Sequence, residues 1–189
     1  KNYSPEDIKK DKKLANSFLN SSLKDLDLSC NIFNGNFYLD SFNYFVIDEK
    51  YRTFESLYTR DSYINNKHFY QKNFFEKFTT SIDNFKEFNN MILLGSNAAN
   101  NYYSNLLQFL PRIFFIKDEK IKLGIHRNSS TKFREFIKLI LDSRNIKFSF
   151  LYLDDGFYKF IDCQIPQFLD MQKSIKLLKR YLLPKNLKS

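Results

Sequence analysis

The chain has 189 residues, of which 30 are basic and 21 acidic, giving a net charge of +9. It is 43% hydrophobic and 18% aromatic, which excludes a disordered tail, because such tails combine low hydrophobicity with few aromatic residues. No run of about 18 apolar residues occurs, so no membrane-spanning helix is expected. Its two cysteines, Cys30 and Cys163, cannot form a disulfide framework, which predicts a reducing, cytoplasmic compartment.

The positive charge has two interpretations. Lysine, asparagine, isoleucine, phenylalanine and tyrosine are abundant while glycine and proline number only four each, a bias typical of A/T-rich coding sequences. Selection for a polyanionic partner would favour arginine, which reads phosphates and bases through two parallel hydrogen bonds. Since lysine far outnumbers arginine, we expect no nucleic-acid partner.

The first half of the chain divides into two regions. Residues 1–30 form a charged helical segment, whose lysine cluster is either a solvated face or a contact with a membrane surface. Residues 31–90 form a β-rich extension with a small antiparallel element, in which Asn34-Gly35 predicts a tight turn. Residues 61–90 show no clean period and are interpreted as loop and irregular helix.

The second half shows clearer periodicity. The pattern predicts strands at Met91–Leu94, 121–125, 147–153 and Phe157–Cys163, and helices at 98–116, 130–143 and 170–183. Pro111 is expected to kink or end the first of these helices. Alternation of strand and helix at this spacing predicts a parallel sheet, so we expect a Rossmann-like α/β domain over 91–170, followed by a basic helix or linker over 171–189.

Ligands of open α/β sheets bind beyond the carboxyl ends of the strands, which directs attention to two loops. The loop after the first strand carries Asn97, Asn100 and Asn101, whose donors and acceptors suit carbohydrate; the alternative is an ordinary asparagine-rich helix cap. The loop after the second strand carries His126 and Arg127, which could face an anionic ligand or simply lie on the surface.

Other chemistries find less support in the sequence. Two cysteines far apart and two unpaired histidines do not give zinc-ligand spacing, so neither a metal nor another cofactor is expected. Asp154 and Asp155 follow a predicted strand, where they either form a turn or contact a ligand.

One segment carries a family resemblance. Asn101-Tyr102-Tyr103-Ser104-Asn105-Leu106-Leu107-Gln108-Phe109-Leu110-Pro111-Arg112 resembles the N-Y-[YF]-H-W-L-x-D-x-L-P-R segment of glycosyltransferase family 61, which includes capsular polysaccharide biosynthesis proteins. The resemblance extends over residues 31–183. It implies a GT-B architecture and metal-independent, inverting transfer from a nucleotide-sugar donor to a carbohydrate acceptor in surface polysaccharide biosynthesis.

The resemblance also implies roles for particular residues. Ser104 stands at the family's histidine position and Gln108 at its acidic position, so these two are the candidate catalytic residues. Asn101, Tyr102 and Arg112 match the family and are expected to bind substrate in the cleft, although Arg112 could instead pair structurally with an acid. Serine and glutamine are poor proton acceptors.

Two consequences of these departures stay open. The general base could come from elsewhere, with Asp154 and Asp155 as possible substitutes, or the domain could be a degenerate relative that binds glycan or a protein partner. The family's donor-binding half would follow the matched region, so we expect this chain to be the acceptor-side half of a longer protein. Its basic end, 171–189, is then a linker, a contact with anionic lipid at the inner membrane face, or a solvated helix face.

Overall fold

The computed structural model describes residues 29–42, 44–57, 76, 78–95 and 104–182. Their elements in chain order are β1 (Ile32–Asp40), β2 (Phe45–Asp48), η1 (Glu55–Leu57), η3 (Ile82–Asn84), β3 (Lys86–Leu93), η4 (Asn105–Phe109), η5 (Leu110–Phe115), β4 (Lys120–His126), α5 (Thr131–Ser143), β5 (Lys147–Leu153), β6 (Phe157–Pro166) and α6 (Met171–Leu182). The charged helical segment predicted within residues 1–30 lies almost entirely outside the described residues.

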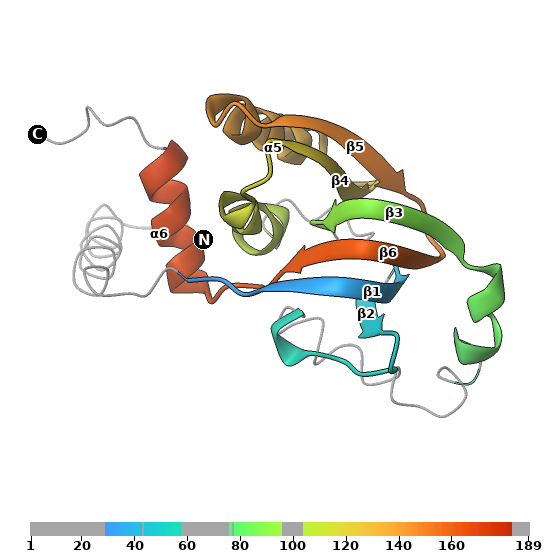
Figure 1. Cartoon of the computed structure of the whole chain (residues 1–189). Helices are drawn as coiled ribbons and strands as arrows, with labels where there is room; N and C mark the ends of the chain where they lie inside the picture. The colour runs from blue at the N-terminus through green and yellow to red at the C-terminus, as the bar shows by residue number, and fades with distance from the viewer. Residues whose placement is uncertain (1–28, 43, 58–75, 77, 96–103, 183–189) are drawn as a thin grey trace, which may run out of the picture.

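The six strands form one mixed, mostly parallel sheet in the order β2-β1-β6-β3-β4-β5 (Figure 1). The pairs β3–β4, β4–β5 and β3–β6 are parallel, and β1 is antiparallel to both β2 and β6. The predicted parallel unit of strands 91–94, 121–125 and 147–153 is therefore confirmed. This α/β architecture is compatible with a Rossmann-like fold.

The β-rich region departs from its prediction in two places. Asn34 and Gly35 do not form a turn but lie within β1, opposite Gln164 and Cys163 of β6. The register of that pairing shifts between Gly35 and Phe37, so the flexible glycine serves a bulge instead. The small antiparallel β1–β2 element is confirmed, and it belongs to the same sheet as the rest of the molecule.

The irregular structure predicted for residues 61–90 is wrong at its end. Lys86–Asn90 belong to β3, although only Phe88 among them is apolar. The strand is held by its parallel pairing with β6, which begins at Lys86 opposite Tyr158. The predicted start of the Rossmann-like domain, residue 91, therefore lies within β3.

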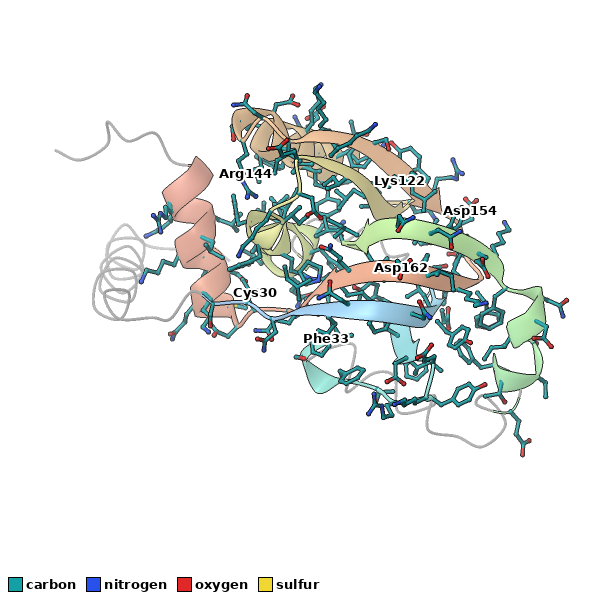
Figure 2. The ribbon with its side chains drawn as sticks, viewed as in Figure 1. Cys30, Phe33, Lys122, Arg144, Asp154 and Asp162 are labelled. Atoms are coloured by element: carbon teal, nitrogen blue, oxygen red, sulfur yellow. The ribbon has the colours of Figure 1, made fainter. Side chains whose placement is uncertain are left out.

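The helices follow their local signals. Ser130 caps α5, its hydroxyl accepting a hydrogen bond of 3.2 Å from the backbone N–H of Phe133, as the serine before an amphipathic run predicts. Arg144 ties the other end of α5 to η5 by donating to the carbonyl oxygens of Ile113 and Ile116 at 2.8 and 2.6 Å (Figure 2).

The predicted helix over 98–116 is not a single α-helix where it is described. A π-helical turn, η4, passes at Leu110 into the 3₁₀-helix η5. Pro111 lies in the first turn of η5, where its missing N–H breaks no hydrogen bond. η4 and η5 lie between α6 and the sheet (Figure 1), and their buried side chains join those of α5 and the strands in the main core.

A close contact between Gly95 and Tyr44 gives a first prediction. Gly95 has φ +71, and a Cβ added there would lie 2.0 Å from Cε2 of the buried Tyr44 ring. Gly95→Ala is therefore expected to lower the free energy of unfolding by about 2–3 kcal/mol, measured by urea denaturation.

Gly124→Ala is the matched control for this substitution. An added Cβ at Gly124 would lie 2.2 Å from Cε of Met91, the flexible end of a side chain that adapts readily. We expect a loss of at most about 1.5 kcal/mol. Equal losses in the two variants would contradict the rigid packing of Tyr44 on Gly95.

Candidate functional site

Arg112 is the most deeply buried polar residue among the described residues of the family-like segment, 104–112. Its side chain has no solvent exposure. Its guanidinium donates to the carbonyl oxygens of Pro166 (2.7 Å), Leu93 (3.4 Å) and Leu94, and to the hydroxyl of Tyr44 (3.1 Å). Its Cζ also lies 4.2 Å from the centre of the Phe168 ring, a cation–π distance.

The expectation that Arg112 lines a substrate cleft is therefore corrected. Its hydrogen bonds to backbone carbonyls hold the ends of β3 and β6 against η5, another joins it to the Tyr44 hydroxyl, and no part of the side chain reaches solvent. The alternative expectation for Arg112 is a structural role in which it pairs with an acid. The observed role is structural, but its partners are backbone carbonyls and not an acid. Sequence could not show this, because Leu93 and Pro166 are distant from Arg112 along the chain.

The other residues of the segment are only partly described. Asn97, Asn100, Asn101 and Tyr102 lie outside the described residues. Ser104 is the residue before the π-helical turn η4 and Gln108 lies on that turn, and both side chains are half-buried. The buried Asn105 side chain finds no hydrogen-bond partner within the described part of the chain.

A second group of polar side chains gathers where β4 and β5 end. These strands are parallel neighbours whose last residues, His126 and Leu153, lie opposite each other. The loop after β4 therefore meets the turn between β5 and β6. We name the group that they form the strand-end cluster, which consists of His126, Arg127, Arg134, Asp154 and Asp155.

His126 and Asp155 form a hydrogen-bonded pair within the strand-end cluster. Nε2 of His126 lies 2.8 Å from Oδ1 of Asp155, and Nδ1 accepts a hydrogen bond of 3.1 Å from the backbone N–H of Asn128. Since Nδ1 accepts, the proton of the neutral ring is on Nε2 and is donated to Asp155. His126 is only 2% exposed, whereas Asp155 is 54% exposed, so the carboxylate faces solvent and the imidazole supports it from inside.

Arg127 and Asp154 form the second pair of the cluster, on the protein surface. Nε of Arg127 contacts Oδ1 of Asp154, and Nη2 lies 3.4 Å from Oδ2. The hydrogen bond from Arg127 lowers the pKa of Asp154, and the same bond raises the pKa of Arg127. Asp154 is thus held as an anion whose charge is paired with that of Arg127. Among the described residues, Asp155 has no arginine partner and contacts the His126 ring instead.

Arg134 of α5 and Tyr152 of β5 complete the surroundings of the Arg127–Asp154 pair. The guanidinium carbons of Arg127 and Arg134 lie 5.6 and 5.9 Å from the centre of the Tyr152 ring. Arg134 also donates to the carbonyl oxygen of Arg127 and to the hydroxyl of Thr131, both at 3.3 Å. These contacts fix two cations beside the amino-terminal end of α5, where the helix dipole adds to their positive potential.

The arrangement combines a solvent-facing carboxylate with two guanidinium groups and a helix amino terminus. A carboxylate can accept a proton from a hydroxyl, and the cations can bind anionic groups of a ligand. The sequence singled out both the 126–131 loop and Asp154-Asp155, and the structure brings them together. Sequence missed Tyr152, whose place on an edge strand gave no signal, and Arg134, which lies in the first turn of α5.

The described ranges contain neither a metal-ligand cluster nor a membrane-spanning helix. No group of three histidine, cysteine, aspartate or glutamate side chains there could hold a metal ion. None of the helices in these ranges has the length and apolar character that crossing a bilayer requires.

The fold and the strand-end cluster define an α/β protein with a mixed, mostly parallel sheet and a polar site at the ends of two parallel strands. Comparisons with family models, curated proteins and solved structures find no match to the chain.

Proposed function

We propose that this chain is the acceptor-side half of an inverting, nucleotide-sugar-dependent glycosyltransferase of GT-B architecture, acting in capsular or surface polysaccharide assembly. Three features support the proposal: the α/β sheet, the position of the family-like segment between β3 and β4, and a polar site at the ends of β4 and β5. The partners are a nucleotide-sugar donor and a carbohydrate acceptor, in the cytoplasm at the inner face of the membrane.

The observation that carries the proposal is the setting of Asp155. In the proposed reaction its carboxylate accepts the proton of an acceptor hydroxyl. The hydroxyl oxygen forms a bond to the anomeric carbon of the donor sugar, and the bond from that carbon to the nucleoside diphosphate breaks with its electron pair on the leaving group. His126 keeps Asp155 in place through Nε2–H, and the exposed face of the carboxylate is open to the acceptor.

The cationic part of the cluster has a separate task in the proposal. Arg127 and Arg134 flank the amino-terminal end of α5, so they would bind anionic groups of the acceptor and orient its hydroxyl towards Asp155. Ser104 and Gln108 would contribute hydrogen bonds to the acceptor rather than proton transfer, because neither side chain is a competent base.

The proposal is tested by following nucleoside diphosphate release from a panel of sugar nucleotides by the longer protein that contains both this acceptor-side half and a donor-binding half, with and without oligosaccharide acceptors. We expect release that depends on an acceptor. Release that is equally fast without any acceptor would indicate hydrolysis, and no release from any donor would contradict the proposed transfer.

A second function, glycan binding without catalysis, is favoured by two observations. Arg112 of the Leu-Pro-Arg match is fully buried and has a structural role. The family's two proton-transfer positions are occupied by Ser104 and Gln108, which are poor proton acceptors. A protein that binds glycan but does not turn over any sugar nucleotide would have this second function.

A further inference from the structure

An irregularity runs across three strands of the sheet. Asn90 in β3 and Asp162 in β6 have φ values of 53° and 50°, in the left-handed region that side chains other than glycine seldom adopt. The register pairs Asn89 with Ile161 and Met91 with Cys163, so the two left-handed residues lie at the same level of adjacent strands. The bulge of β1 continues this line, since the N–H of Asp162 donates to Oδ1 of Asn36 at 3.2 Å.

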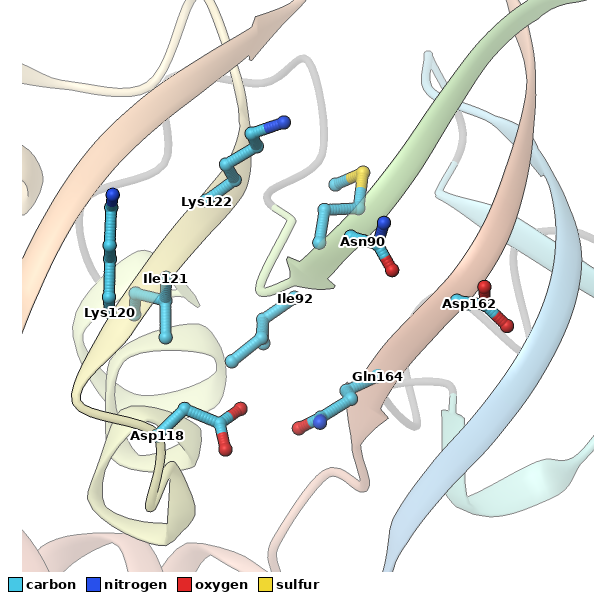
Figure 3. Close-up of a pocket in the computed structure, with 9 residues that line it drawn as sticks. Asn90, Ile92, Asp118, Lys120, Ile121, Lys122, Asp162 and Gln164 are labelled. Carbon is cyan, nitrogen blue, oxygen red and sulfur yellow. The ribbon is translucent and has the colours of Figure 1, made fainter.

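A polar hollow of about 200 Å³ lies at this irregularity (Figure 3). Asn90 of β3 and Asp162 and Gln164 of β6 line one side, and β4 with the segment before it lines the other. Asp118 and Gln164 point towards each other in the close-up (Figure 3). The full lining is Asn90, Met91, Ile92, Asp118, Lys120, Ile121, Lys122, Asp162 and Gln164.

The positive and negative charges that line the hollow are equal in number but, within the described part of the chain, form no ion pairs with one another. Two lysines, Lys120 and Lys122, stand against two aspartates, Asp118 and Asp162, so the formal charge is zero. Among the described residues no ion pair joins them. Because the formal charge of the lining is zero, the hollow has no net attraction for a phosphate or another strong anion.

We propose that this hollow is a binding subsite for one neutral pyranose unit of a glycan. A sugar hydroxyl both donates and accepts, which matches a lining of ammonium, carboxylate and carboxamide groups. Ile92 and Ile121 also line the hollow, but their side chains are buried in the core, so the polar groups around them supply the contacts to the ring. The left-handed backbone at Asn90 and Asp162 is retained because it brings both side chains to the ligand.

The subsite is separate from the strand-end cluster. Lys120 and Lys122 belong to the first part of β4, whereas His126 ends that strand. The proposal therefore does not depend on sugar transfer, and an Asp155→Asn variant is expected to keep the binding.

The test uses heteronuclear NMR titration of the ¹⁵N-labelled chain with the methyl β-glycosides of glucose, galactose and N-acetylglucosamine, each up to about 50 mM. We expect at least one glycoside to shift the amide signals of Asn90, Lys122, Asp162 and Gln164. Glycine is the informative substitution, because it accepts a positive φ without strain and removes only the side chain. Asn90→Gly and Asp162→Gly are expected to weaken binding about 3- to 10-fold, the loss of one hydrogen bond, without lowering Tm.

Asn145→Gly is the matched control. Asn145 also has a positive φ, 57°, but it follows α5 and does not line the hollow. Its variant is expected to bind as the wild type does. The proposal is overturned if none of the three glycosides shifts these signals, or if Asn90→Gly and Asp162→Gly bind as tightly as Asn145→Gly.

Discussion

Arg112→Leu is expected to lower the free energy of unfolding by about 3–5 kcal/mol, the largest loss of any single substitution considered for this protein. The leucine side chain has no N–H group, so the carbonyl oxygens of Leu93, Leu94 and Pro166 lose the hydrogen bonds that Arg112 donates to them. Buried acceptors without donors cost about 1–3 kcal/mol each. Urea denaturation followed by circular dichroism measures the loss.

Two further variants make the Arg112 prediction specific. Arg112→Lys is expected to recover little, because one ammonium group cannot reproduce the planar fork that reaches three carbonyls. Arg134→Leu removes an arginine from the surface of α5 and is expected to change stability by less than about 1 kcal/mol. An Arg112→Leu protein as stable as the Arg134→Leu protein would contradict the structural role of Arg112.

Under the proposed function, Asp155→Asn is expected to slow sugar transfer by about 10²- to 10⁴-fold, the usual contribution of a general base. The amide cannot accept the proton of the acceptor hydroxyl. Its Oδ1 can still accept the hydrogen bond from Nε2 of His126, so the fold and the position of the imidazole are expected to survive. The measurement is the rate of acceptor-dependent nucleoside diphosphate release under saturating donor.

Asp142→Asn is the matched control for the Asp155 substitution. Asp142 is an exposed carboxylate of α5 that lies 3.5 Å from Nζ of Lys138, outside the strand-end cluster. Its variant is expected to transfer sugar at the wild-type rate. An Asp155→Asn enzyme that also keeps that rate would place the base elsewhere in the protein.

Local patterns predicted the second half of the fold well. The strand at 147–153 matches β5 to the residue, and α5 begins one residue from its predicted start. Both elements have strong periodicity, and α5 also has a serine cap, so neighbouring residues along the chain determine them. The parallel order of β3, β4 and β5 followed from the alternation of strands and helices.

The errors share a physical cause, which is dependence on distant partners. Asn34-Gly35 has the local signature of a turn, but pairing with β6 draws it into a strand. Lys86–Asn90 are polar because much of that strand is exposed, so no apolar alternation revealed them. The same holds for Arg112, whose acceptors come from the ends of β3 and β6.

In the strand-end cluster too, local sequence indicated the loops but not the contacts between distant residues. Sequence identified the loop after β4 and the Asp154-Asp155 turn as places to look, because both follow predicted strands. It could not show that His126 would hold Asp155, since the two residues are 29 positions apart and meet only through the pairing of β4 with β5.

The most direct test of the account is the anomeric configuration of the product formed from an α-linked sugar nucleotide and an oligosaccharide acceptor, read by ¹H NMR during the first turnovers. A single carboxylate that deprotonates the acceptor predicts one displacement and therefore a β-linked product. An α-linked product would mean that the configuration is retained, which would contradict an inverting transfer with Asp155 as its base.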